Sequence, residues 1–266
     1  MSNNAPIGIF DSGVGGLTVV REIMALLPQE SIIYVGDDSR FPYGPRPQEE
    51  IQEFAFQITD FLINQGVKIV VVACNTVSSQ ALDFLLAHFP VPILGVIEDT
   101  ASYALPLSQK KRIGVLATPG TVFSNAYPKA FSRLDPSIKV VQVASQALVN
   151  LIENGSGAKN GVKEFASKVI SPFKEKGVDV LILGCTHYPY LVKLMKELIG
   201  DQAQIVDPAL AVARRVQKEL EERGLKAGNN HPRRIFYTTG NPDLFLQVGS
   251  QIYPDLKEVR ELKLLK

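Results

Sequence analysis

The stretch that decides the fold reads Gly-Val-Lys-Ile-Val-Val-Val-Ala-Cys-Asn-Thr over residues 66–76, and it recurs as Gly-Val-Asp-Val-Leu-Ile-Leu-Gly-Cys-Thr-His over residues 177–187. Each copy is an apolar run that ends in a cysteine followed by polar side chains, which predicts a buried strand leading into a polar loop. Cys185 follows Cys74 by 111 residues, and the chain has only these two cysteines. The repeat indicates a duplicated architecture with one thiol in each copy.

The composition is typical of a globular protein that acts on a small molecule. The chain has 266 residues, 45% of them hydrophobic and 21% charged, which is enough for one large domain or two smaller ones. Its 28 basic and 27 acidic residues give a formal charge of +1. This balance provides no electrostatic basis for binding nucleic acid or a membrane surface, so we expect neither as a partner.

The sequence also predicts a cytoplasmic location. Residues 1–6 lack the basic segment followed by an apolar one that a secretory signal requires, and no apolar run approaches the roughly 18 residues of a membrane span. Cytoplasmic thiols stay reduced, and the spacing of the two cysteines suggests neither a disulfide framework nor a metal cage. With only three histidines in the chain, we expect no metal.

Short β-branched runs alternate with segments of helical period, which is typical of an α/β fold with mainly parallel sheets. Further matches extend the duplication: residues 8–12 align with 114–118, and Ser31-Ile32 with Ser137-Ile138, both at an offset of 106. The expected elements are strands at 7–10 and 31–35, a helix carrying Leu17, Val20, Met24 and Leu27, a helix carrying Ile51, Phe54, Ile58, Phe61 and Leu62, and a tail with a helix at 209–223, a strand at 234–238 and a helix near Leu244.

These patterns predict two similar α/β domains, each a mainly parallel sheet flanked by helices, related by a pseudo-twofold duplication. The first domain comprises residues 1–98 and 208–266, with the tail folded back on it, and the second comprises residues 99–207. Ligands of open parallel sheets bind beyond the carboxyl ends of the strands, where both cysteines are expected. We therefore predict an active site in the interdomain cleft, with the thiols on opposite sides.

A single buried cysteine usually behaves as a small hydrophobic residue. The pair changes this interpretation, because hydrogen-bonding side chains follow each thiol where a helix is expected to open: Asn75-Thr76 in one copy and Thr186-His187 in the other. A helix N-terminus lowers the pKa of a thiol and favours the thiolate. We interpret Cys74 and Cys185 as functional groups, and His187 as a proton-transfer partner rather than a core histidine.

A glycine-rich loop, Asp11-Ser12-Gly13-Val14-Gly15-Gly16, follows the first strand. Its structural explanation is a tight strand-to-helix turn in which glycine supplies a permissive backbone and Asp or Ser caps the helix. A dinucleotide loop would need a third glycine where Thr18 stands, which disfavours nucleotide binding. Asp11 is a candidate for orienting a substrate ammonium group or tuning a thiol.

Other polar groups predict a site for a substrate carboxylate that needs no formal cation. Pro42-Tyr43-Gly44 is explained structurally as a rigid turn, and Arg46 as a solvated or loop-bracing charge. On sequence alone Glu153 is a solvated acid at a helix end. The groups available to a carboxylate are the Gly44 amide and the side chains of Asn75, Thr76 and Thr186, with Thr118 and Thr121 in the second copy's equivalent of the Asp11 loop.

Four motifs together resemble the cofactor-independent aspartate/glutamate racemases. They are residues 8–19, Pro42-Tyr43-Gly44, residues 73–76 and residues 183–189, in the family's order and across essentially the whole chain. The resemblance implies racemisation of glutamate without a cofactor, with the two cysteines acting as acid and base on opposite faces of Cα. Cys74 would take the proton from D-glutamate and Cys185 from L-glutamate. It also implies supply of D-glutamate for peptidoglycan, and we expect a homodimer.

The resemblance further assigns roles to residues around the cysteines. Asp11, Glu153 and His187 look like the family's auxiliary acid–base residues. The chain departs from the family pattern over residues 145–152, where Cys-Pro and a second Pro are common, and at Asp38, where Thr is usual. The implied substrate contacts are Asp11, Ser12, Pro42, Tyr43, Gly44, Asn75, Thr76, Thr118, Thr121, Thr186 and His187.

The chemistry supports the same mechanism. Inverting a stereocentre by proton transfer needs a base on one face and an acid on the other, and no lysine lies in a recognisable motif for an electron-sink cofactor. The site would stabilise the carbanion by fixed hydrogen bonds away from water. The alternatives are an aspartate or other amino-acid racemase, a decarboxylase of the same superfamily that needs one cysteine, a two-lobed solute-binding module without turnover, and a thiol redox protein.

Overall fold

A computed structural model describes residues 3–153, 161–228 and 231–264. The strands are β1 (Ile7–Asp11), β2 (Ile32–Gly36), β3 (Ile69–Val72), β4 (Ile93–Leu94), β5 (Arg112–Ala117), β6 (Lys139–Ala144), β7 (Val180–Gly184), β8 (Gln204–Val206), β9 (Arg234–Thr238) and β10 (Arg260–Glu261). The α-helices are α1 (Leu17–Leu26), α2 (Gln48–Asn64), α3 (Asn75–Gln80), α4 (Leu82–His88), α5 (Ile97–Ala104), α6 (Pro119–Phe123), α7 (Ala126–Leu134), α8 (Gln146–Glu153), α9 (Val162–Glu175), α10 (Val192–Ile199), α11 (Pro208–Glu222) and α12 (Pro242–Ile252).

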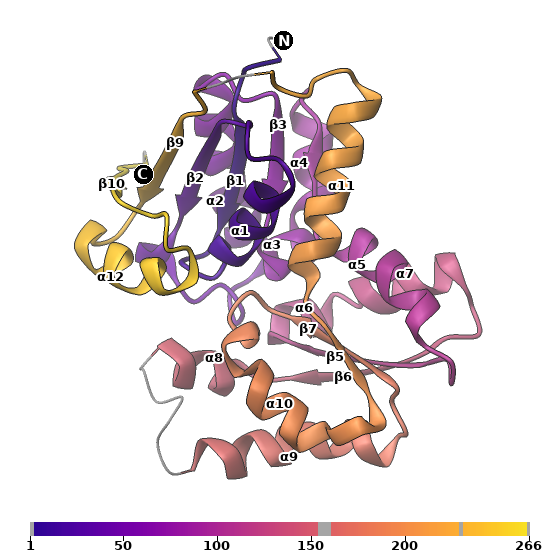
Figure 1. The fold of residues 1–266 in the computed structure, drawn as a ribbon. Helices are drawn as coiled ribbons and strands as arrows, with labels where there is room; N and C mark the ends of the chain where they lie inside the picture. Colours follow the sequence, from indigo (N-terminus) through magenta and orange to yellow (C-terminus); the bar gives the residue numbers. More distant parts are fainter. Residues whose placement is uncertain (1–2, 154–160, 229–230, 265–266) are drawn as a thin grey trace. The chain divides into compact units, whose positions relative to one another are not determined.

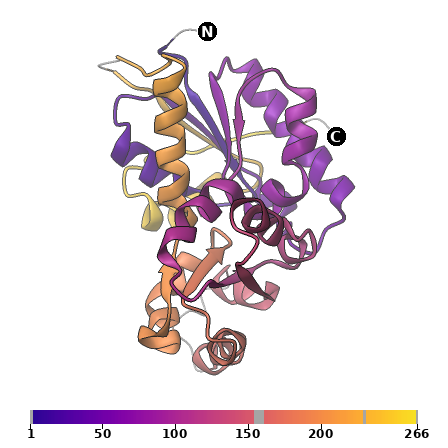
Figure 2. The same ribbon diagram turned by 90° about the vertical axis from the view of Figure 1, so that its right-hand side faces the viewer.

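The chain forms two compact units, Met1–Val96 with Ala209–Lys266 and Ile97–Pro208. The first unit contains a parallel sheet of order β10-β9-β2-β1-β3-β4 (Figure 1). Helices α1 and α11 lie on one side of this sheet, and α2 and α4 lie on the other (Figure 2). Because both faces are covered, its central strands are buried along their whole length rather than alternating between buried and exposed residues.

The second unit contains a parallel sheet of order β6-β5-β7-β8. Helices α9 and α10 pack against each other, as do α5 and α7. Two parallel sheets flanked by helices confirm the predicted α/β fold class. The order β6-β5-β7-β8 repeats β2-β1-β3-β4 of the first unit, strand for strand.

The pairing registers show how far the duplication extends. Gly8 pairs with Val70 between β1 and β3, and Gly114 pairs with Leu181 between β5 and β7, which agrees with the offsets of 106 and 111 read from the sequence. Strand β1 is therefore equivalent to β5, and β3 to β7, residue by residue, and both cysteines follow equivalent strands.

The predicted match of Ser31 with Ser137 is wrong. Gly8 pairs with Ile33, whereas Gly114 pairs with Val141, two residues beyond the position that an offset of 106 requires. The local roles of the two serines explain the difference. The Ser31 hydroxyl accepts the Arg233 amide, while Ser137 lies in a turn closed by the Asp135 carboxylate.

A glycine ends the helix before each cysteine strand. Gly66 follows α2 and Gly177 follows α9, with φ of 77° and 65°. Each amide donates to a carbonyl of the helix's last turn, and the next amide reaches the carbonyl of Leu62 (3.5 Å) or Phe173 (3.0 Å). This helix-ending motif needs a left-handed residue, which only glycine adopts at little cost. The repeated Gly-Val thus fixes how the chain enters both cysteine strands.

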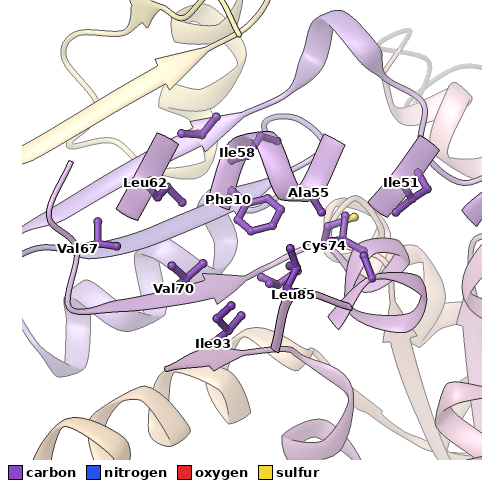
Figure 3. Packing of buried hydrophobic residues seen from close by; sticks show 14 of the residues in the cluster. Phe10, Ile51, Ala55, Ile58, Leu62, Val67, Val70, Cys74, Leu85 and Ile93 are labelled. Carbon is purple, nitrogen blue, oxygen red and sulfur yellow. The ribbon is translucent and has the colours of Figure 1, made fainter. Parts of the chain in front are cut away.

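One layer of the first unit's core lies between its sheet and helices α2 and α4. Phe10 from β1 and Val70 from β3 contact Ile58 and Leu62 of α2 in a cluster that also includes Cys74 (Figure 3). Cys74 is 5% exposed, so its side chain packs partly as a small hydrophobic residue, as cysteines usually do. Any chemistry at its sulfur takes place at the edge of a packed core.

The tail returns to the first unit. Strand β9 pairs with β2 over five residues, from Ile32 with Arg234 to Gly36 with Thr238. An ion pair between Lys68 and Glu30, with Nζ 2.5 Å from Oε2, lies beneath this region and is almost fully buried. The ammonium also donates to the carbonyls of Asn3 and Leu225. One buried charge just before β3 thereby connects Asn3, near the start of the chain, with Leu225 in the segment that follows α11.

Candidate active site

The glycine-rich loop after β1 holds a fixed carboxylate. Asp11 is fully buried, and its Oδ2 accepts the amides of Gly13 at 3.2 Å and Gly16 at 3.1 Å. The Tyr34 hydroxyl donates to the Gly13 carbonyl at 2.6 Å. Asp11 therefore braces the turn into α1, although the N-cap residue of this helix is Gly16 and no side chain caps it. The Asp11 carboxylate is fixed at the carboxyl edge of the sheet.

Gly16→Ala should destabilise the protein by about 1–3 kcal/mol, the usual cost of overpacking. A Cβ at Gly16 would lie 2.5 Å from Asp11 Cβ and 2.7 Å from the Tyr34 hydroxyl, so both side chains would have to move. Gly13→Ala is the matched control, because its Cβ would meet nothing closer than 4.0 Å and should cost within about 0.5 kcal/mol. Urea unfolding of both variants tests this, and equal losses would contradict it.

Cys74 lies where β3 ends, next to β1. It is the N-cap residue of α3, and its sulfur lies 3.8 Å from the Ser12 hydroxyl oxygen. Asn75 and Thr76 form the first turn of the helix, and each is 3% exposed. The structure thus brings Ser12, Cys74, Asn75 and Thr76 together at the carboxyl ends of two adjacent strands.

Tyr43 belongs to a buried network that the sequence did not indicate. Its hydroxyl donates to the carboxylate of Asp37, which also accepts Arg40 Nε at 2.6 Å and the Thr239 hydroxyl at 2.7 Å. Burial, then the Asp37 charge, raises the pKa of Tyr43 well above its ordinary value, and Cys74 adds to the shift. Tyr43 is therefore a neutral hydrogen-bonding group near the first thiol.

The raised pKa of Tyr43 predicts a pH dependence of stability. Because the folded state holds this proton more tightly than the unfolded state, its contribution is complete below the unfolded pKa of about 10 and declines as the pH rises further. Above pH 10 the wild type should lose up to about 1.4 kcal/mol per pH unit relative to Tyr43→Phe. Parallel unfolding curves for the two proteins between pH 9 and 11.5 would contradict this.

The loop that carries Tyr43 is braced on both sides. The Phe41–Pro42 peptide is cis, Pro42 is half-buried and Gly44 is buried. Arg46 donates to the carbonyls of Arg40 and Pro42 and pairs with Glu50 at 2.7 Å. Its predicted role as a loop-bracing charge is confirmed.

Cys185 lies at the end of β7 in the second unit. Its sulfur lies 3.7 Å from His187 Nδ1, and Cys185, Thr186 and His187 are all buried. A helix opens here as expected, but its first turn is not α-helical: residues Tyr188–Leu191 form a 3-10 helix, and α10 begins only at Val192. Pro189 lies in the first turn of this helix, where its missing amide donor leaves no intrahelical hydrogen bond unmade.

The remaining candidates of the second unit lie on two other elements. Thr118 is the N-cap residue of α6, and its hydroxyl oxygen lies 3.1 Å from that of Thr121. Both are buried. Glu153 is the last residue of α8, and its side chain lies outside the part of the chain that the structure describes.

The candidate residues thus form two groups, one in each unit. Whether the two thiols face each other across a cleft remains a prediction. The first group is Asp11, Ser12, Tyr43, Cys74, Asn75 and Thr76, and the second is Thr118, Thr121, Cys185, Thr186 and His187.

Within the described ranges, no helix is long and apolar enough to cross a membrane. Among the same residues, no group of three His, Cys, Asp or Glu side chains could hold a metal ion.

Comparison with known proteins agrees with these features. Residues 15–216 match the Asp/Glu/Hydantoin racemase family. The chain is 42% identical to the glutamate racemase of Symbiobacterium thermophilum over 94% of its own length and 91% of that protein. A glutamate racemase isoform from Bacillus anthracis superposes with a TM-score of 0.95 at 38% identity, and that of Francisella tularensis in complex with D-glutamate with 0.91 at 36%, each covering 98% of both chains.

Proposed function

The chain belongs to the aspartate/glutamate/hydantoin racemase family, and from this membership we propose that it interconverts L-glutamate and D-glutamate. The observation that carries the choice of substrate is the 42% identity to a glutamate racemase over nearly the whole of both chains. The similar Francisella tularensis enzyme was solved with D-glutamate. Aspartate or another amino acid is the alternative substrate.

The proposed mechanism uses Cys74 and Cys185 as the two proton carriers. With D-glutamate, the Cys74 thiolate takes the Cα proton and becomes a thiol, while the Cys185 thiol gives its proton to the opposite face and becomes a thiolate. The product is L-glutamate, and the reverse reaction begins at Cys185. Each thiol has a polar neighbour that supports this role: the Ser12 hydroxyl at 3.8 Å from Cys74 and His187 Nδ1 at 3.7 Å from Cys185.

We assign substrate binding to the polar groups around the two cysteines. The buried amide and hydroxyl groups of both units would hold the carboxylates and the developing carbanion by fixed hydrogen bonds, which act strongly where water is excluded. Asp11 and His187 would assist proton transfer, and Glu153 joins them by the family pattern. The proposed binding residues are Ser12, Pro42, Tyr43, Gly44, Asn75, Thr76, Thr118, Thr121 and Thr186.

The biological setting follows from the family resemblance. D-glutamate made by such an enzyme would enter peptidoglycan, whose synthesis begins in the cytoplasm, and the working form would be a homodimer. The formal charge of +1 supports the absence of a nucleic-acid partner. Sedimentation of the purified protein tests the assembly, because a homodimer would sediment at twice the chain mass of 29.1 kDa.

Incubation in heavy water tests the substrate. The protein should exchange the Cα proton of L-glutamate and remove its optical rotation. L-Aspartate, one methylene shorter, should react about 10- to 200-fold more slowly, because that is the discrimination a single methylene usually provides. Faster exchange of L-aspartate would establish the alternative substrate. Binding of L-glutamate without exchange would favour a solute-binding module and contradict the proposed enzyme.

A further inference from the structure

Tyr188 connects the Cys185 loop to the other strand ends of its sheet. It is fully buried, and its amide donates to the Cys185 carbonyl at 3.1 Å. Its hydroxyl reaches the Ser145 carbonyl at 2.7 Å and the Ala117 carbonyl at 3.1 Å. Ala117 ends β5 and Ser145 follows β6, so one side chain extends from the loop after β7 across the neighbouring strand to the next.

This connection places the loop relative to a second group of candidate residues. Ala117 directly precedes Thr118, and Ser145 directly precedes α8. The Ser145 amide donates to the Ala117 carbonyl at 2.9 Å, so the two acceptors of the phenol are themselves held together. These hydrogen bonds therefore fix the position of the backbone around Cys185 and His187 relative to the backbone that carries Thr118.

The first unit holds its cysteine loop in a different way. The position equivalent to Tyr188 is Val77, inside α3, whose side chain has no polar group. There the next residue, Ser78, donates to the Val72 carbonyl at 3.0 Å and accepts the Val96 amide at 3.2 Å. A short serine thus binds β3 to the chain after β4, whereas a long tyrosine spans from β7 to β6. The two thiols are supported by unrelated contacts on a common scaffold.

We propose that Tyr188 is a positioning residue that fixes the Cys185–His187 loop for proton transfer on one face of the substrate. This inference rests on the proposed function for its catalytic consequence, but the placement of the thiol can be measured without any turnover. Burial, and to a lesser degree the Cys185 charge, raises the pKa of Tyr188 well above its ordinary value. The phenol therefore remains a donor through the whole pH range in which a cysteine thiol titrates.

Tyr188→Phe removes the donor and keeps the ring. It leaves the Ser145 carbonyl without this donor. The Cys185–His187 loop should then become more mobile at the end next to residue 188. Because the chain has only two cysteines, iodoacetamide labelling with peptide mapping reports each thiol separately. We expect alkylation of Cys185, which is 7% exposed, to accelerate at least about threefold, while Cys74 in the other unit changes less than about 1.5-fold. The kcat for glutamate should fall about tenfold or more with a smaller change in KM, as expected when a misplaced group slows proton transfer.

Two further variants separate positioning from general loosening. Tyr253→Phe removes a tyrosine hydroxyl that contacts Arg234 in the first unit. It should leave unchanged the labelling ratio, which is the rate of Cys185 alkylation divided by that of Cys74. A 4-aminophenylalanine at position 188 still donates and should restore both the ratio and kcat. If Tyr188→Phe does not fold, a variant with 4-fluorophenylalanine at position 188 is used instead, because its fluorine fills the space of the hydroxyl without donating a hydrogen bond. The expected labelling ratio is the same as for Tyr188→Phe.

The outcomes are distinct. Equal acceleration at both cysteines, or an unchanged ratio with unchanged kcat, would overturn the proposal. A changed ratio in a protein that shows no turnover of either amino acid, even as wild type, would uphold the positioning role and reject the proposed racemase function.

Discussion

Cys74→Ala and Cys185→Ala should each lower the rate of glutamate racemisation by about 10⁴-fold, the upper end of what a positioned proton-transfer group contributes. In the proposed mechanism each substitution leaves one face of Cα without an acid or base, so neither direction of the reaction can be completed. The measurement is the loss of optical rotation of L-glutamate and of D-glutamate. Retention of more than a few per cent of wild-type activity by either variant would contradict the two-base mechanism.

The packing of the two cysteines decides which controls this experiment needs. Cys74 lies in the apolar cluster of the first unit, so Cys74→Ala also removes a core atom and should lower stability by about 1 kcal/mol, as a small cavity does. Cys74→Ser keeps the volume and should be as inactive. Thermal unfolding of all variants distinguishes loss of chemistry from loss of fold. If activity is lost only in the variants whose melting temperature falls, the cysteines have a structural role.

Lys68→Met should lower the free energy of unfolding by about 3–5 kcal/mol, because removing one partner of a buried ion pair leaves the other charge uncompensated. The exposed fractions of the Lys68 and Glu30 side chains are 0% and 1%. The other Glu30 oxygen accepts the Ala227 amide at 2.8 Å, so the carboxylate cannot turn toward water without breaking that bond. Urea unfolding measures the loss.

A second ion pair provides the matched control for this prediction. Lys168 pairs with Glu164 at 2.8 Å on the surface of α9, where both side chains are more than 70% exposed. Surface pairs of this kind contribute little, because water and salt screen them. Lys168→Met should leave the unfolding midpoint almost unchanged. A similar loss in both variants would show that the effect does not depend on burial.

The sequence predicted those parts of the fold that depend on local patterns. The apolar runs located β3 and β7, and the helical period located α2 with Ile51, Ile58 and Leu62 buried. The tail strand Arg234–Thr238 was placed correctly as well. These features succeed because burial of whole strands and helix faces determines the periodicity of apolar residues.

The parts that could not be predicted depend on partners distant in sequence. Asp37 gave no signal, because Thr239 lies 202 residues away from it. Tyr188 belongs to the motif of residues 183–189, yet its hydroxyl binds carbonyls 43 and 71 residues earlier. Every residue has a backbone carbonyl, so the amino-acid sequence does not show which carbonyls accept these hydrogen bonds. The 3-10 geometry of Tyr188–Leu191 shows the same limit, since Pro189 is tolerated in the first turn of an α-helix as well and does not distinguish the two helix types.

The return of residues 209–266 to the first unit has a consequence for synthesis on the ribosome. Residues 97–208 are complete, with all four strands of their sheet, before β9 and β10 have been translated. Translation usually lets the N-terminal domain fold first, but here the earlier unit must wait for its last two strands and for the Leu225 carbonyl that accepts the Lys68 ammonium. At about 5–20 residues per second the delay is several seconds, during which the outer edge of β2 is unpaired and open to chaperones or to another nascent chain.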